Sequence, residues 1–309
     1  MIKLPSGIEI KKLIDDLRIL SWEASEILIY YEQILKDPNN KSNILENSNI
    51  KDPVTLADLK VNEKIIEKIN EKYNGVDWEI LSEENVKISS VKSDLNSDWI
   101  WILDPLDGTK DFIQGTENYA MHLALNYKKK PFLGIVLIPK RNELWISYGE
   151  KVWCERRDGS KTELKISRNK IFKEMILVTS QNHRNQTLEN LIQKINFKKT
   201  LIMGSIGCKI SSILRGESDI YICLSLPEKS CPKDWDFAAP EAILKAAGGS
   251  ITNLNNEELI YNQTNFEQKG LIVASSDKKT HASICKQIKE IIEKDEFLSK
   301  SLNLRELQE

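Results

Sequence analysis

The segment Leu103-Asp104-Pro105-Leu106-Asp107-Gly108-Thr109 places two carboxylates directly after an apolar run. Its proline fixes φ and its glycine permits conformations that other residues resist, so we expect a sharp turn there. Across that turn Asp104 and Asp107 can converge with the carbonyl of Leu106, a set of oxygens that suits Mg²⁺. A cation between the two carboxylates would also relieve their repulsion. Because Asp, Pro and Gly in its Asp-Pro-x-Asp-Gly pattern are all turn formers, an ordinary turn is an equally good interpretation.

Three further acidic positions have structural interpretations of their own. Ser82-Glu83-Glu84 follows an apolar run, where paired acids are commonly a solvated strand edge. Pro240 is tolerated in a first helical turn, which places Asp236 near a helix N-cap. Asp58 is either the capping partner of Thr55 or a catalytic acid. Taken singly, each position favours the structural interpretation.

The elements that must position these residues follow from apolar periodicity. Helical spacing from Leu13 to Leu35 predicts a long amphipathic helix, and Thr55-Leu-Ala-Asp58 predicts the start of a second one. Residues 78–81 and 99–103 read as buried strands, and short apolar runs from Tyr119 to Glu155 predict an antiparallel meander.

After residue 159 strand-like and helical patterns alternate, which is typical of βα units around a second sheet. We therefore predict an α/β protein of two parts. Residues 1–169 would form an α+β subdomain with an antiparallel sheet and most metal ligands. Residues 170–309 would form an α/β subdomain with the substrate-binding residues.

The composition excludes several classes of protein. Lys and Arg number 44 and Asp and Glu 46 among 309 residues, a net charge of −2, which argues against a nucleic-acid partner or a polybasic membrane protein. The apolar runs are too short to cross a bilayer and the first residues lack a signal-peptide pattern, so we expect a cytoplasmic protein. The five cysteines and three histidines show no metal-ligand spacing, which leaves oxygen ligands for any metal.

Taken together, the acidic motifs resemble those of the inositol monophosphatase superfamily, a group of lithium-sensitive Mg²⁺ phosphatases. The resemblance runs from about Asp52 to Gly249 and depends on the order Asp58, Ser82-Glu83-Glu84, residues 104–109 and Trp235-Asp236. It implies a layered αβαβα sandwich, monomeric or homodimeric, with its site between two subdomains.

The resemblance also implies a role for each residue. Two or three Mg²⁺ ions would be held by four carboxylates and one carbonyl: those of Glu83, Asp104, Asp107 and Asp236, and that of Leu106. Asp58 would accept a hydrogen bond from Thr109, whose hydroxyl helps to deprotonate the attacking water. The backbone N–H groups of Gly108 and Thr109 could hold a phosphate oxygen.

Within the superfamily, three patterns are similar to the 3′(2′),5′-bisphosphate nucleotidases, which convert adenosine 3′,5′-bisphosphate to AMP. They are residues 107–115, Gly204-Ser205-Ile-Gly207-Cys-Lys209 and Thr179-Ser180-Gln-Asn-His183. This branch implies that His183, Ser205, Lys209 and Asp236 contact the substrate.

Cys223 departs from the branch, because some nucleotidases carry there an arginine that holds the distal phosphate. Lys229 or Lys233 could substitute for it. The alternative enzyme is an inositol or sugar phosphatase with the same metals. A non-catalytic bisphosphate-nucleotide sensor would not need a water-activating pair. A glycosidase would need only two carboxylates and leaves Thr109 and Asp236 unexplained.

Overall fold

A computed structural model describes residues 2–37, 55–88, 95–166, 170–180, 185–225, 231–263 and 265–302. One sheet has seven strands in chain order: β1 (Glu79–Ser82), β2 (Trp99–Asp107), β3 (Ala120–Tyr127), β4 (Lys130–Ile138), β5 (Glu143–Tyr148), β6 (Lys151–Arg156) and β7 (Lys161–Glu163). The other has the order β11-β12-β10-β8-β9, from β8 (Ile176–Ser180), β9 (Lys199–Met203), β10 (Ile220–Ser225), β11 (Ser250–Asn253) and β12 (Gly270–Ser275).

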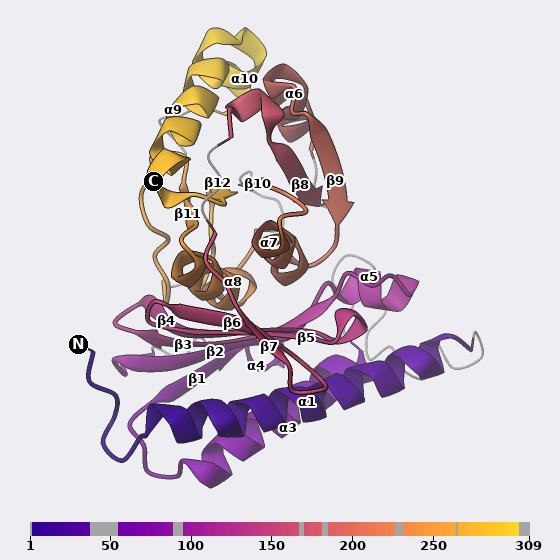
Figure 1. The fold of residues 1–309 in the computed structure, drawn as a ribbon, viewed down its shortest axis with the longest axis vertical. Coiled ribbons are helices and arrows are strands. Elements are labelled where there is room, and N and C mark those ends of the chain that lie inside the picture. The colour runs from indigo at the N-terminus through magenta and orange to yellow at the C-terminus, as the bar shows by residue number, and fades with distance from the viewer. Residues whose placement is uncertain are drawn as a thin grey trace.

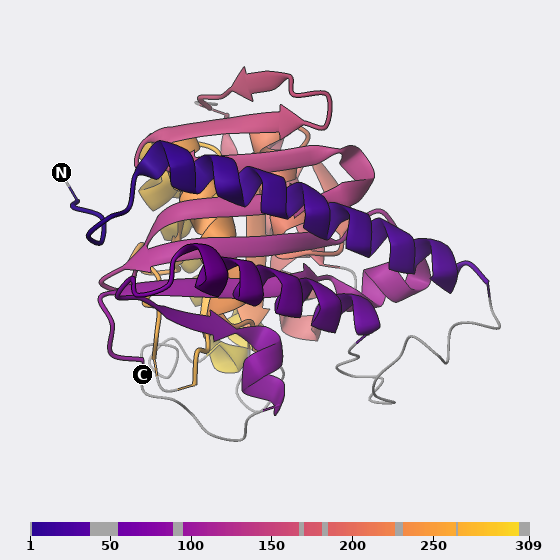
Figure 2. The same cartoon turned by 90° about the horizontal axis from the view of Figure 1, so that it is seen from below.

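The helices form three layers around these sheets (Figure 1). Those of the described residues are α1 (Ile10–Leu35), α3 (Leu56–Lys72), α4 (Glu83–Ile88), α5 (Thr109–Gln114), α6 (Gln186–Ile195), α7 (Ile206–Arg215), α8 (Asp234–Ala247), α9 (Lys278–Lys294) and α10 (Glu296–Ser301). Helices α1 and α3 cross the outer face of the seven-stranded sheet (Figure 2). Helices α7 and α8 lie between the sheets, and α6, α9 and α10 cover the far face of the second sheet. The αβαβα sandwich is therefore confirmed.

Strand β2 carries the carboxylate turn and is buried on both faces. Trp101 and Leu103 pack toward α1 and α3, whereas Ile100 and Ile102 belong to the core around α7 and α8. A strand covered on both sides reads as a continuous apolar run, as this one does. Its carboxyl end lies in the interior, where α7 and α8 meet the sheet.

Local predictions are mostly confirmed, with two corrections. The strand expected to end at Leu103 continues to Asp107 through a β-bulge, so the chain turns only at Gly108. The meander forms antiparallel pairs from β2 to β7, and Thr55 caps α3 in a capping box with Asp58. Pro240, however, lies well inside α8 rather than in its first turn. Its missing N–H leaves the carbonyl of Asp236 without the usual helical partner. Asp236 is nevertheless in the first turn, as expected.

The change of sheet falls between β7 and β8, close to the predicted boundary near residue 170. Helix α8 comes from the second part of the chain but packs against β3, β4 and β5. The division into 1–169 and 170–309 stays a prediction. Among the residues that the structure describes, no helix is both long and apolar enough to cross a membrane.

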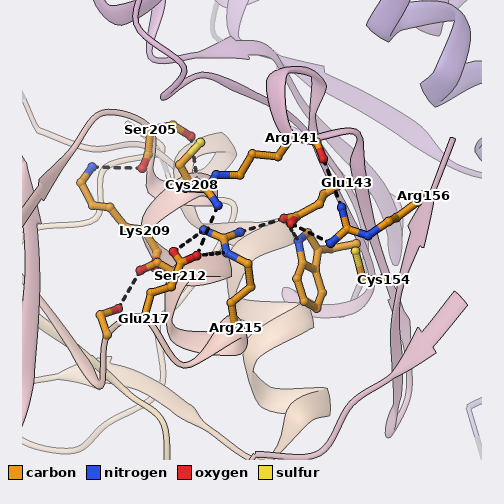
Figure 3. A network of polar contacts seen from close by, with 12 residues as sticks. Arg141, Glu143, Cys154, Arg156, Ser205, Cys208, Lys209, Ser212, Arg215 and Glu217 are labelled. Atoms are coloured by element: carbon orange, nitrogen blue, oxygen red, sulfur yellow. Dashed lines mark hydrogen bonds and ion pairs between the residues drawn. The ribbon is translucent and has the colours of Figure 1, made fainter.

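An ion-pair network fastens the end of α7 to the first sheet (Figure 3). The Arg215 guanidinium donates to Glu143 Oε2 at 2.8 Å and to both carboxylate oxygens of Glu217 at 2.9 Å. Glu143 is buried on β5 and also accepts from the indole N–H of Trp145 at 3.1 Å. Because the ion pair of Arg215 and Glu143 is largely buried, it fixes the relative position of its two elements better than an exposed ion pair would. It anchors α7 at the end opposite the site.

Candidate active site

Three carboxylates converge where β2 ends and α8 begins. Asp104 and Asp107 come from β2 and Asp236 from the first turn of α8, and one oxygen of each lies within 4.8 Å of the others. Backbone N–H groups orient two of them: Leu106 donates to Asp104 Oδ1 at 3.0 Å and Lys233 donates to Asp236 Oδ2 at 2.5 Å. The convergence predicted for the first two aspartates is present, with Asp236 beside them.

Electrostatics make this cluster costly without a cation. Burial raises the pKa of Asp104 well above its usual range, and the charges of Glu83, Asp107 and Asp236 raise it further. Burial, followed by the charges of Asp107 and Glu83, likewise raises the pKa of Asp236. A divalent ion among these oxygens would offset both effects. The donor set therefore fits a hard metal ion.

Two other expected ligands lie near the cluster. Glu83 begins α4 directly after β1, which pairs with β2, and its charge acts on both Asp104 and Asp236. Its carboxylate contacts Lys87 at 2.8 Å. The carbonyl of Leu106 accepts from the hydroxyl of Thr109 at 3.0 Å, and a carbonyl oxygen has a second lone pair for a metal.

Asp58 caps α3 and also contacts Thr109, whereas its catalytic role stays a prediction. Its Oδ2 accepts from the backbone N–H of Thr55 at 2.9 Å and from the Thr55 hydroxyl at 2.5 Å, which is the helix cap. Its Oδ1 lies 3.2 Å from Thr109 Oγ1, whose single hydrogen is shared between this oxygen and the carbonyl of Leu106. The carboxylate is 1% exposed, and this burial raises its pKa to about 7. Capping and the expected catalytic contact use different oxygens.

Residues at the N-terminus of α7 donate hydrogen bonds to one carboxylate oxygen of Asp107. Asp107 Oδ2 accepts from Ser205 Oγ at 2.7 Å, from the N–H of Ile206 at 2.5 Å and from that of Gly207 at 3.3 Å. Ser205 also caps the helix by accepting from Cys208 N at 3.2 Å and has a φ of +46°. A left-handed φ at a residue other than glycine is costly and commonly marks a functional site. Ser205, which we expected to contact substrate, contacts a proposed metal ligand here.

Lys209 is buried rather than a surface lysine. It is 3% exposed, its Nζ donates to the carbonyl of Ser205 at 3.1 Å, and it lies 5.5 Å from the ring centroid of Tyr221. Burial lowers its pKa, while the charge of Asp107 acts in the opposite direction. The structure thus places the buried ammonium of Lys209 beside the carboxylate cluster. It is a positive charge separate from the expected metal ions.

Gly108 is a position that requires glycine. Its φ is +90°, it precedes α5, and a Cβ there would come within 2.8 Å of the carbonyl oxygen of Asn118. Gly108 is the N-cap of α5 and Thr109 is its first residue. Because the first N–H groups of a helix have no partner within the helix, both stay candidates for a phosphate contact.

The remaining sequence-based candidates have different outcomes. His183 and Lys229 lie outside the described residues. The ammonium of Lys233 contacts Glu267 Oε1 at 3.1 Å and the carbonyl of Asn265 at 3.3 Å, so it is already engaged elsewhere. Cys223 lies on β10, where burial raises the pKa of its thiol, and it is close enough to Lys209 and Asp236 for their charges to act on that pKa as well.

Sequence reasoning missed His122, which is fully buried on β3 with Nε2 3.3 Å from Asp107 Oδ2. One signal was available: His122 is a titratable residue between Met121 and Leu123 in a strand predicted as core. A buried polar residue in such a run commonly has a polar partner to satisfy it.

A family model described as the inositol monophosphatase family matches residues 12–293. The chain belongs to this family. The 3′(2′),5′-bisphosphate nucleotidase CysQ of Buchnera aphidicola is 32% identical over 182 residues, which is 59% of this chain and 64% of that protein. The nucleotidase CysQ of Escherichia coli K12 is 27% identical over 209 residues, which is 68% of this chain and 79% of that protein. The match thus spans less than two thirds of the Buchnera protein.

Solved structures confirm the inositol monophosphatase fold. Inositol monophosphatase-II of Staphylococcus aureus superposes with a TM-score of 0.68 at 23% identity, covering 90% of this chain and 94% of that one. At that identity the likeness concerns the fold alone. The predicted family and phosphatase class are confirmed, and the names of the two relatives favour the bisphosphate nucleotidase branch. The family is metal-dependent, and the cluster of Asp104, Asp107 and Asp236 fits that requirement.

Proposed function

We propose that this chain hydrolyses adenosine 3′,5′-bisphosphate to AMP and phosphate in a Mg²⁺-dependent reaction. The observation that carries the proposal is the contact between Thr109 Oγ1 and Asp58 Oδ1, beside the three-carboxylate cluster. Similarity to two bacterial proteins named as bisphosphate nucleotidases supports the choice of substrate. The reaction acts on a small molecule.

The residues proposed to hold two or three Mg²⁺ ions are Glu83, Asp104, Asp107, Asp236 and the carbonyl of Leu106. All five ligands supply oxygen, and the pKa of Asp104 and Asp236 is raised by burial and by crowding of like charges. When bound, Mg²⁺ lowers the pKa of a coordinated water and neutralises charge on the phosphoryl and leaving oxygens.

Asp58 and Thr109 form the proposed proton-accepting pair. A hydroxyl alone is a weak base, but when Thr109 donates its hydrogen to Asp58 its oxygen is free to accept one from the attacking water. Asp58 is buried and its pKa is raised to about 7, so it can hold a proton near neutrality. The helix cap at Thr55 keeps the other oxygen of Asp58 occupied and thereby fixes the orientation of the carboxylate.

Recognition of the second phosphate is assigned to the start of α7. Lys209 supplies a positive charge that burial keeps poorly solvated, and such a cation pairs strongly with an anionic oxygen. Ser205, His183 and the N–H groups of Gly108 and Thr109 complete the proposed substrate contacts. A monomer or homodimer and a cytoplasmic location stay predictions.

Phosphate release by the pure protein tests the proposal. With Mg²⁺, adenosine 3′,5′-bisphosphate is expected to give a higher kcat/KM than inositol 1-phosphate or fructose 1,6-bisphosphate. Preference for one of the latter would retain the metal site but assign the chain to an inositol or sugar phosphatase. Binding of the nucleotide with no phosphate released would indicate a sensor.

A further inference from the structure

His122 lies where three parts of the site meet. It sits on β3 directly opposite Asp104 in the pairing with β2, and its side chain is 0% exposed. The neighbouring turns belong to α7 and α8, which carry Ser205 and Asp236 into the site. Burying an imidazole is unfavourable unless it has polar partners, so the polar contacts of His122 indicate its role.

Both ring nitrogens face oxygens of the site. Nδ1 lies 3.3 Å from the carbonyl oxygen of Trp235, the residue immediately before Asp236. A carbonyl only accepts, so Nδ1 carries the hydrogen at this contact. Nε2 lies 3.3 Å from Oδ2 of Asp107 but makes no hydrogen bond to it. With the hydrogen on Nδ1, a neutral ring presents a lone pair at this nitrogen. The hydrogen bond of His122 therefore goes to the backbone next to Asp236, and the other edge of its ring lies beside Asp107.

The same ring supports the first turn of α7. A Cβ placed on Gly207 would lie 2.2 Å from Nε2 of His122 and 2.8 Å from Cγ1 of Val136, so glycine is required for this approach. The N–H of Gly207 also donates to Asp107 Oδ2 at 3.3 Å. The imidazole thus sets the distance at which α7 packs on the sheet while α7 holds Asp107.

We propose that His122 is a positioning residue of the metal centre, which fixes the first turns of α7 and α8 relative to each other by packing on Gly207 and by hydrogen bonding to the Trp235 carbonyl. Asp107, held by the N-terminus of α7, and Asp236, in the first turn of α8, are placed through these two helices. Through these contacts Asp107 and Asp236 present their oxygens at a separation suited to one cation before it binds. The inference rests on the proposed metal site. Groups that orient metal ligands typically account for about 10- to 100-fold in metal affinity.

Binding of Mn²⁺ without substrate, followed by the paramagnetic signal of the free ion, tests this role independently of turnover. His122→Asn removes the ring edge that packs against Gly207 of α7, and we expect Mn²⁺ affinity to fall about 10- to 100-fold. His281→Asn is the matched control, because it also removes a histidine that is 1% exposed but contacts Thr252 and Ser275 instead. That control should bind Mn²⁺ like the wild type.

Two further measurements cover the case in which His122→Asn does not fold. Gly207→Ala keeps the imidazole but forces it away from α7, and it should also weaken Mn²⁺ binding. In the wild type labelled with ¹⁵N-histidine, Mg²⁺ should shift the imidazole signals of His122 and leave those of His281 in place. Wild-type affinity in a folded His122 variant, an equal loss in His281→Asn, or an unmoved His122 signal overturns the inference. Absence of Mn²⁺ binding by the wild type would overturn the metal site itself.

Discussion

The hydroxyl of Thr109 lies 3.2 Å from Oδ1 of Asp58, which joins the start of α5 to the first turn of α3. Thr55 donates a hydrogen bond to Oδ2 of the same carboxylate, which restricts the orientation of the Asp58 side chain. A base that is fixed in place loses little entropy when the water is activated.

Asp58→Asn should reduce kcat by about 100-fold or more, the usual contribution of a positioned proton acceptor. The amide oxygen of asparagine can still accept from the N–H of Thr55, so the cap and the fold should persist. Steady-state kinetics and circular dichroism are the measurements, with Thr55→Ser as a control that keeps the capping hydroxyl. Ordinary turnover in Asp58→Asn would exclude the pair from catalysis.

Lys209→Met should raise KM for adenosine 3′,5′-bisphosphate about tenfold or more while sparing a substrate with one phosphate. The reason is that a charge-assisted hydrogen bond to a buried ammonium contributes roughly 1.5–3 kcal/mol. Methionine has nearly the same length and fills the space beside Tyr221. Equal losses on the two substrates would remove Lys209 from recognition of the second phosphate.

Mg²⁺ should stabilise the folded protein, since it binds the native carboxylate cluster and not the unfolded chain. At an ion concentration of about 100 Kd the expected gain is about 2.7 kcal/mol. Thermal unfolding with Mg²⁺ and with a chelator measures this gain. Asp107→Asn should abolish the difference between the two conditions, and a Tm of the wild type that ignores Mg²⁺ would contradict the assignment of the cluster.

The free energy of unfolding should decrease in mild acid because His281 is buried in its neutral form. Burial lowers its pKa to about 4 from the ordinary 6.5, so the unfolded chain binds the proton more tightly. Its contribution is complete above pH 6.5 and is lost as the pH falls toward 4, by about 2 kcal/mol at pH 5. Urea unfolding of the wild type and His281→Asn between pH 7 and 5 should show this difference in slope. Parallel curves would show that His281 titrates normally.

How far the sequence predicts this molecule depends on how local each feature is. The cap at Thr55 and the meander follow from neighbouring residues, and both are present. The segment after Leu103 does not turn at once, because β2 continues through a bulge to Asp107. The contact of Asp107 with the N-terminus of α7 joins residues 98 to 100 positions apart, and no local pattern specifies it.

Two particular residues show where pattern reasoning ends. The surroundings of His122 could not be predicted, because they come from β2, α7 and α8, which only the tertiary fold brings together. Pro240 was expected to mark a first helical turn, yet α8 extends past it on both sides. The helix is buried along almost its whole length, and that packing outweighs the loss of one backbone hydrogen bond.

The most direct test of the central claim is kcat/KM for phosphate release with Mg²⁺, compared among adenosine 3′,5′-bisphosphate, inositol 1-phosphate and fructose 1,6-bisphosphate. We expect a clear preference for the nucleotide that disappears in Lys209→Met and total loss of turnover in Asp107→Asn. A preference for inositol 1-phosphate or fructose 1,6-bisphosphate, unchanged in Lys209→Met, would contradict the account of the substrate.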